Sequence, residues 1–161
     1  MFIPDSESAD MMLKRLELYK RLYTQIAEVQ KVGLNNNRVA TERNLLRTID
    51  QLENYLASSL DQDPLLLVNF SPEISDTEIS EWKNKAINII DSNIRPAVSA
   101  YLDQLKTDHL PKGRGDDKCG IMWIDGGEES YLRSLRKYTG HKDTTVKEVH
   151  EIGLSEIERL K

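Results

Sequence analysis

Apolar residues recur at helical spacing through most of the 161-residue chain. In the first half this spacing predicts one helix that ends at Gly33, with either Ser6 or Ser8 placed to cap its start. A second helix is expected from about Arg38 to Ser58, after an asparagine-rich turn that also supplies its cap. The pattern therefore predicts a helical hairpin over residues 1–60.

The third predicted helix is the longest, and it begins after Ser75 and ends before Pro111. Ser75 and Glu78 have the spacing of a capping box, in which each residue binds the other's backbone N–H group. Pro96 lies inside the helix, but the apolar stripe keeps its register on both sides of the proline. A kink at Pro96 is therefore expected rather than a break.

Two further helices are predicted after an exposed loop over residues 112–120. The fourth follows the Gly126–Gly127 turn, and the fifth starts at Thr145, where Glu148 completes a second capping box. The apolar face expected to be buried on the fourth helix is formed by Tyr131, Leu132, Leu135 and Tyr138, and that of the fifth by Val149, Ile152, Gly153 and Ile157.

Together these elements predict an all-α fold, an irregular bundle of about five helices in one domain over residues 1–161. Its second sub-segment, residues 72–161, would hold the long kinked helix, the loop and the last two helices. The apolar run Leu65–Val68 has no evident partner strand, so it is interpreted as an extended connector packed on the helices. At most one short strand pair is expected.

Charge and composition narrow the classes of partner. The chain has 22 basic and 27 acidic residues, a formal net charge of −5, and no strongly basic segment. It therefore lacks the electrostatic footprint of a nucleic-acid-binding protein. The longest uninterrupted apolar run, Leu65–Val68, is far too short to span a membrane. No signal peptide is recognisable, so these residues alone predict no compartment.

No residue spacing predicts a metal or cofactor site. His150–Glu151 begins like the zinc motif His-Glu-x-x-His, but Leu154 stands where the second histidine is required. His109, His141 and the single cysteine, Cys119, have no partner at ligand spacing. We therefore expect no metal ligand, no cofactor and no catalytic residue in this chain.

The turn before the fourth helix leaves two interpretations open. Gly126 and Gly127 could present backbone N–H groups to a carboxylate or phosphate, or they could simply form a tight turn that needs glycine. Tyr131, one turn further on, is more readily explained as a core residue. Gly126, Gly127 and Tyr131 are the only candidates for lining a substrate channel, and residue chemistry alone predicts a helical domain without an active site.

Several stretches nevertheless resemble one bacterial family, the domain-of-unknown-function family DUF885. The most specific lie in the second half, at residues 110–131, 136–139 and 144–156. Shorter stretches at residues 38–43, 51–52, 63–66 and 94–101 also fit, so that the resemblance covers nearly the whole chain.

The resemblance implies that the chain is a helical piece of a zinc metallopeptidase-like hydrolase. Members of the family are longer, and are often exported or lipid-anchored, which implies a periplasmic or exported full-length protein. Their His-Glu-x-x-x-Gly-His-like metal segment lies downstream of the last predicted helix, so zinc is implied only for the full-length protein. Val146 replaces the family's helix-opening proline, and residues 138–140 replace a His-Thr-Thr stretch. No catalytic residue of the family can be carried over.

Two functions follow from this resemblance and from the residue chemistry. The chain is either the non-catalytic helical portion of such a hydrolase, shaping its substrate channel, or a stand-alone helical interaction module. The expected partners are the remainder of a longer polypeptide, with this chain an expressed fragment or a truncated product, or a second copy in a homodimer. The homodimer would form through the last two helices, because nothing in the sequence covers Val149, Ile152 and Ile157.

Overall fold

The computed structural model describes residues 2–161, and it is all-α, as the sequence predicts. Its α-helices are α1 (Ser6–Glu17), α2 (Tyr19–Asn35), α3 (Glu42–Ala57), α4 (Asp76–Ile89), α5 (Arg95–Gln104), α6 (Gly127–Thr139) and α7 (Val146–Leu160). Short 3-10 turns fill the connections at Leu60–Gln62, Pro64–Leu66, Leu110–Lys112, Asp116–Lys118 and Ile121–Trp123. The five predicted runs are thus found as seven α-helices, because two of the runs are interrupted.

The first interruption divides the predicted first helix at Leu18 into α1 and α2. The cap is Asp5 rather than Ser6 or Ser8: its side chain accepts a hydrogen bond from the Ser8 N–H group at 2.7 Å. Gly33 does not end the helix, which continues to Asn35 before Asn37 takes a left-handed conformation with φ 53°. Asparagine tolerates this conformation better than most residues, so it ends the helix here.

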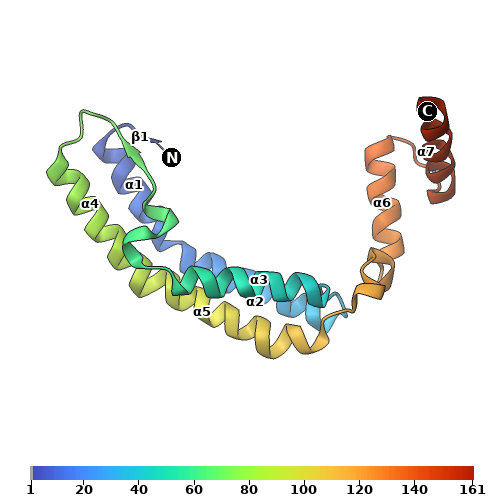
Figure 1. The fold of residues 1–161 in the computed structure, drawn as a ribbon, viewed down its shortest axis with the longest axis horizontal. Helices are drawn as coiled ribbons and strands as arrows, with labels where there is room; N and C mark the ends of the chain where they lie inside the picture. The colour runs from blue at the N-terminus through green and yellow to red at the C-terminus, as the bar shows by residue number, and fades with distance from the viewer. Residues whose placement is uncertain (1) are drawn as a thin grey trace.

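The second interruption lies in the long third run, where α4 and α5 are joined by a π-helical segment, Ile90–Ile94. The Arg95 N–H group donates to the Ile90 carbonyl, one residue further back than in an α-helix. Pro96, which has no N–H group to donate, follows immediately. A π turn before a proline bends a helix without ending it, and Figure 1 shows the run bending where α4 passes into α5.

A second correction concerns α3, which begins at Glu42 instead of Arg38. Residues 38–41 lie outside the helix because this segment pairs with a distant loop. The Arg114 N–H group donates to the Ala40 carbonyl, and the Glu42 N–H group donates to the Arg114 carbonyl. Thr41, not an asparagine, is the N-cap.

The connector between α3 and α4 is less extended than expected. Pro64–Leu66 forms a 3-10 turn, and Asn69–Phe70 then forms strand β2, which pairs in parallel with β1 (Phe2–Ile3). This is the one short strand pair among the described residues, consistent with the prediction. Leu65, Leu66 and Val68 pack on the core, as expected for this connector.

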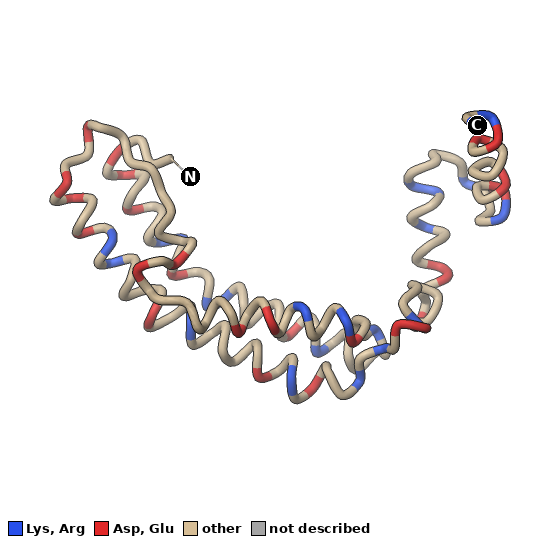
Figure 2. The backbone as a smooth tube through the Cα atoms, viewed as in Figure 1, with Lys and Arg blue, Asp and Glu red and all other residues tan. Residues whose placement is uncertain are grey.

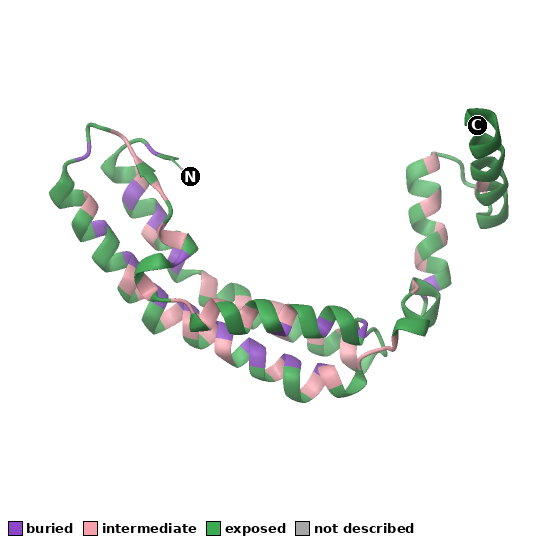
Figure 3. Ribbon diagram, viewed as in Figure 1, coloured by how far each residue is buried: buried purple, intermediate pink, exposed green. Residues whose placement is uncertain are grey.

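The helices divide into two regions with different packing. In the body (residues 2–115), α1 lies against α4, and α2 and α3 lie against α5. One core cluster lies around α1 and α4, and another around α3 and α5. The arm (residues 116–161) contains α6 and α7 and extends away from the body (Figure 1). Figure 3 shows the consequence: buried residues lie along the body, whereas the arm is mostly exposed, with half-buried residues on α6.

Candidate functional site

Three arginines of the body reach across the joint to the arm, and one of them, Arg43, has its Nη2 atom 2.5 Å from the Asp116 Oδ2 atom. Arg114 donates from Nε to the Val39 carbonyl at 2.8 Å and from Nη1 to the Gly120 carbonyl at 2.9 Å. Arg38 donates from Nε to the Asp125 carbonyl at 3.2 Å. Arg38 and Arg114 belong to the body and donate hydrogen bonds to carbonyl groups of the arm. These bonds give the base of α6 a defined position on the body.

The glycines of the predicted site lie in this joint. Gly126 has φ 69°, a left-handed conformation that glycine adopts without cost. A Cβ atom at Gly127 would lie 1.7 Å from the Ile121 carbonyl oxygen, so any side chain there would clash. The Gly127 N–H group donates to the Ile124 carbonyl at 2.9 Å and is not free to bind an anion. The tight-turn interpretation therefore accounts for both glycines.

Tyr131 is not a core residue, and this part of the prediction is wrong. Its exposed fraction is 43%, and that of Tyr138, on the same helix, is 84%. Both side chains were expected in the core because their spacing is amphipathic, but no other element of the described chain covers this face of α6. These two exposed tyrosines, with the exposed Met122 and Trp123 in the turn just before α6, are here called the α6 surface.

The histidines are spread over both regions. His109 is buried in the body, with its Nε2 atom 3.2 Å from the Gln104 Nε2 atom. Since that amide nitrogen can only donate, the His109 ring accepts and is neutral. Burial lowers the pKa of His109. His141 and His150 are exposed on the arm, as is Cys119.

The structure does not bring these histidines and the cysteine together. Within residues 2–161, no three His, Cys, Asp or Glu side chains are grouped so that they could hold a metal ion. Nor does the same stretch contain a helix long and apolar enough to cross a membrane. Figure 2 shows Lys and Arg residues interspersed with Asp and Glu along the helices.

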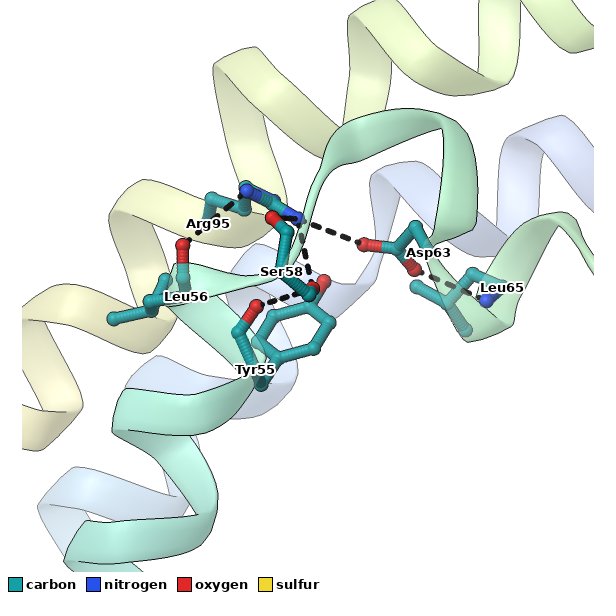
Figure 4. A network of polar contacts seen from close by, with 6 residues as sticks. All are labelled: Tyr55, Leu56, Ser58, Asp63, Leu65 and Arg95. Carbon is teal, nitrogen blue, oxygen red and sulfur yellow. Dashed lines mark hydrogen bonds and ion pairs between the residues drawn. The ribbon is translucent and has the colours of Figure 1, made fainter.

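A buried polar network lies where the connector meets the start of α5 (Figure 4). Asp63 is fully buried, and its Oδ2 atom lies 3.7 Å from Arg95 Nη2. Arg95 also donates to the Ser58 carbonyl at 2.8 Å and to the Leu56 carbonyl at 3.4 Å, and its guanidinium lies over the Tyr55 ring. One cation thus binds the end of α3, the connector and α5 together.

The charged groups of this network have a structural role. The pKa of the Tyr55 hydroxyl is raised by burial and by the Asp63 carboxylate beside it, so the phenol stays protonated. The other Asp63 oxygen accepts from the Leu65 N–H group at 3.0 Å, which fixes the 3-10 turn of the connector. The network therefore positions backbone segments and offers no group in a nucleophilic state.

The sequence did not single out Asp63 and Arg95, although each carries a local signal. Each directly precedes a proline, and Arg95 interrupts the apolar stripe of the longest helix. A charged residue within an apolar stripe indicates a buried partner of opposite charge. Spacing alone cannot identify Asp63 as the partner of Arg95, since the two are 32 residues apart.

The described residues form an all-helical structure with a packed body and an arm whose apolar side chains are largely exposed. The chain belongs to the family described as bacterial protein of unknown function (DUF885), whose model matches residues 1–161. No curated protein and no solved structure matches the chain.

Proposed function

We propose that this chain is a non-catalytic helical portion of a metallopeptidase-like hydrolase, and that the α6 surface faces the part of the enzyme that binds metal and substrate. The chain belongs to DUF885 over residues 1–161, and the proposal adds what the resemblance implies of that family, namely longer, metallopeptidase-like members. In this proposal Gly126 and Gly127 set the direction of α6, and Tyr131 contributes to the wall of the substrate channel.

The observation that carries the proposal is the uncovered α6 surface on a fixed joint. The exposed fractions of Met122, Trp123, Tyr131 and Tyr138 are 43–84%. Exposed apolar and aromatic side chains are typical of a surface that binds another polypeptide. Arg38, Arg114 and the Gly126–Gly127 turn hold this surface in a defined orientation, which reduces the entropy lost on docking.

The test combines this chain with the metal-motif portion of a DUF885 protein, produced as a separate polypeptide. We expect the two to form a complex, and the complex to hydrolyse peptides faster than the metal-motif portion alone. The double substitution Met122→Ser and Tyr131→Ser should weaken the complex at least about tenfold, since two apolar contacts are lost. Leu46→Ser is the matched control, because Leu46 is 47% exposed but lies on α3.

Equal binding by the double variant and the control would contradict the proposal, as would activity that does not respond to added chain. The alternative is a stand-alone interaction module, which the uncovered helix α7 favours because its apolar residues also lack cover. The coding sequence after Lys161 separates the two: a continuing frame with a His-Glu-x-x-x-Gly-His-like segment supports the hydrolase, and a stop codon supports the module.

A further inference from the structure

Besides the α6 surface, two more apolar faces of the chain are uncovered. The first lies along the outer side of α2 and its preceding residue, and is formed by Leu18, Leu22, Val29 and Val32, here called the α2 stripe. Their exposed fractions are 47–71%. The spacing of four, seven and three residues places them on one side of the helix, with Gln25 between them. A hollow beside Leu18 and Leu22 is lined also by Arg15, Arg21 and Gln25.

The second face lies on α7 and is formed by Val146, Val149, Ile157 and Leu160, with Gly153 at its centre, here called the α7 stripe. Val149 is half-buried, and the other three large side chains are 43–74% exposed. A Cβ atom built on Gly153 would have no neighbour within 4 Å. Nothing in the described chain therefore fills the space in front of the centre of this stripe.

The two stripes match in length and in their middle position. Each spans 15 residues from its first to its last member, which is about 21 Å along the helix axis. Each has four large apolar side chains, two on either side of a central residue seven positions from both ends. That central residue is Gln25 in α2 and Gly153 in α7, so the glycine leaves room for the longer amide when the helices pack together.

The two segments that carry the stripes have net charges of opposite sign. Residues 11–32, which contain the α2 stripe, carry five basic and two acidic residues. Residues 146–160, which form α7, carry four acidic and two basic residues. Opposite net charge on two segments steers them together and disfavours pairing of like with like. It therefore favours an α2–α7 contact over an α7–α7 contact.

Within one molecule the two stripes are apart, because α7 lies at the end of the arm and α2 lies in the body (Figure 1). We infer that α7 of one copy docks on the α2 stripe of a second copy, and that two such reciprocal contacts close a twofold dimer. Each copy gives one stripe and receives the other, which is the self-complementary arrangement that twofold symmetry requires. This pairing differs from a dimer made by the last two helices alone.

The test is sedimentation velocity on the full chain and on two single variants, over concentrations of about 1–200 µM, the range in which a dimer of modest affinity dissociates. Leu22→Glu disables the α2 stripe, and Ile157→Glu disables the α7 stripe. Both residues are about half exposed, so the monomer should keep its fold, which circular dichroism checks. We expect the unmodified chain to dimerise, and each variant to raise the dimer dissociation constant roughly a thousandfold, since each substitution occurs twice at a central contact. Leu46→Glu, with the same exposed fraction as Leu22, should leave the dimer intact.

The mixture of the two variants makes the test specific. The Leu22→Glu chain keeps an intact α7, and the Ile157→Glu chain keeps an intact α2 stripe. One of the two reciprocal contacts can therefore form between them, and we expect the mixture to associate although neither variant does so alone. Raising the salt concentration should weaken the association, because the charged residues of both segments are exposed. A monomer at every concentration, a dimer that survives Leu22→Glu, or a mixture that stays monomeric would overturn the inference.

Discussion

Of residues 2–161, sixteen apolar side chains are buried, and all of them lie between Ile3 and Leu105, whereas in residues 116–161 the one buried residue is Gly127. The arm nevertheless contains ten of the eighteen large apolar side chains that are exposed. The body and the arm have equally clear helical periodicity, but only the body buries the faces that this periodicity creates. Amphipathic spacing thus indicates that a face will be covered, and does not say by what.

The helices of the arm rely on local interactions instead of a core. α7 has the Thr145–Glu148 capping box and an exposed Lys147–Glu151 ion pair, with 3.7 Å between the charged atoms. Exposed pairs of this kind contribute less than about 1 kcal/mol, and an isolated helix of this length is marginal in water. We therefore expect α7 to open far more readily than the helices of the body unless a partner covers it.

The largest expected effect on stability comes from loss of the buried Asp63–Arg95 ion pair in the body. Arg95→Met leaves the fully buried Asp63 carboxylate without its cation, and should lower the free energy of unfolding by about 3–5 kcal/mol. Urea denaturation followed by circular dichroism measures it. Arg133→Met is the control in the arm, where the Arg133–Glu129 pair is exposed, and a loss as large there would contradict the distinction between body and arm.

A nearly equal effect is expected from truncating the core. Ile90→Ala removes a fully buried side chain between α4 and α5 and should lower the free energy of unfolding by about 2–5 kcal/mol. Ile157→Ala, on α7, should change it by less than about 0.5 kcal/mol in the monomer, because Ile157 is 55% exposed. Similar losses in the two variants would show that α7 is packed in solution.

A smaller effect is expected from removing either capping box, one at α4 in the body and one at α7 in the arm. Ser75→Ala removes the acceptor for the Glu78 N–H group, 3.3 Å away, and should lower the free energy of unfolding by about 1 kcal/mol. The same change at Thr145 should reduce the helicity of α7 and leave the main unfolding transition unmoved. Thermal denaturation with helicity measured before the transition separates the two outcomes, and a Ser75→Ala variant as stable as the original would mean that the box at α4 does not stabilise the body.

The smallest expected effect is a loss of stability at low pH, which is caused by His109 in the body. Burial lowers the pKa of His109 below its ordinary value of 6.5, while Asp108 raises it and Lys112 lowers it to a smaller degree. The unfolded chain therefore takes up a proton before the folded chain does, and stability should fall as the pH drops from about 7 through 6.5 towards the folded pKa. Denaturation at about pH 7.5 and about pH 5.5, on either side of the ordinary histidine pKa, should show this loss, and His109→Gln should reduce it. An equal pH response in the variant would assign the loss to other groups.

The sequence predicted the features that depend on neighbours along the chain. Both capping boxes and the bend at Pro96 are set by residues within one or two turns, and all three are present. The late start of α3 could not be predicted, because it depends on Arg114, more than 70 residues away. The burial expected of Tyr131 and Tyr138 is wrong for a related reason: periodicity defines a face, and only tertiary contacts decide whether that face is covered.

The candidate site was predictable to a smaller degree. The Gly126–Gly127 turn could be located because glycine pairs mark turns, but its tightness follows from the Ile121 carbonyl, which the sequence does not place. The Asp63–Arg95 ion pair joins two segments that are brought together by the packing of the whole body. The sequence therefore could not predict that these two residues pair.

Hydrogen exchange read by mass spectrometry tests the contrast between body and arm most directly. The chain is measured at a concentration low enough to be monomeric, so that no second copy covers the arm. We predict that peptides from α4 and α5 exchange only through global unfolding, and that peptides from residues 146–160 exchange almost as fast as an unprotected chain. Protection of α7 equal to that of α4 in the monomer would contradict the account, because it would mean that the arm has a core of its own.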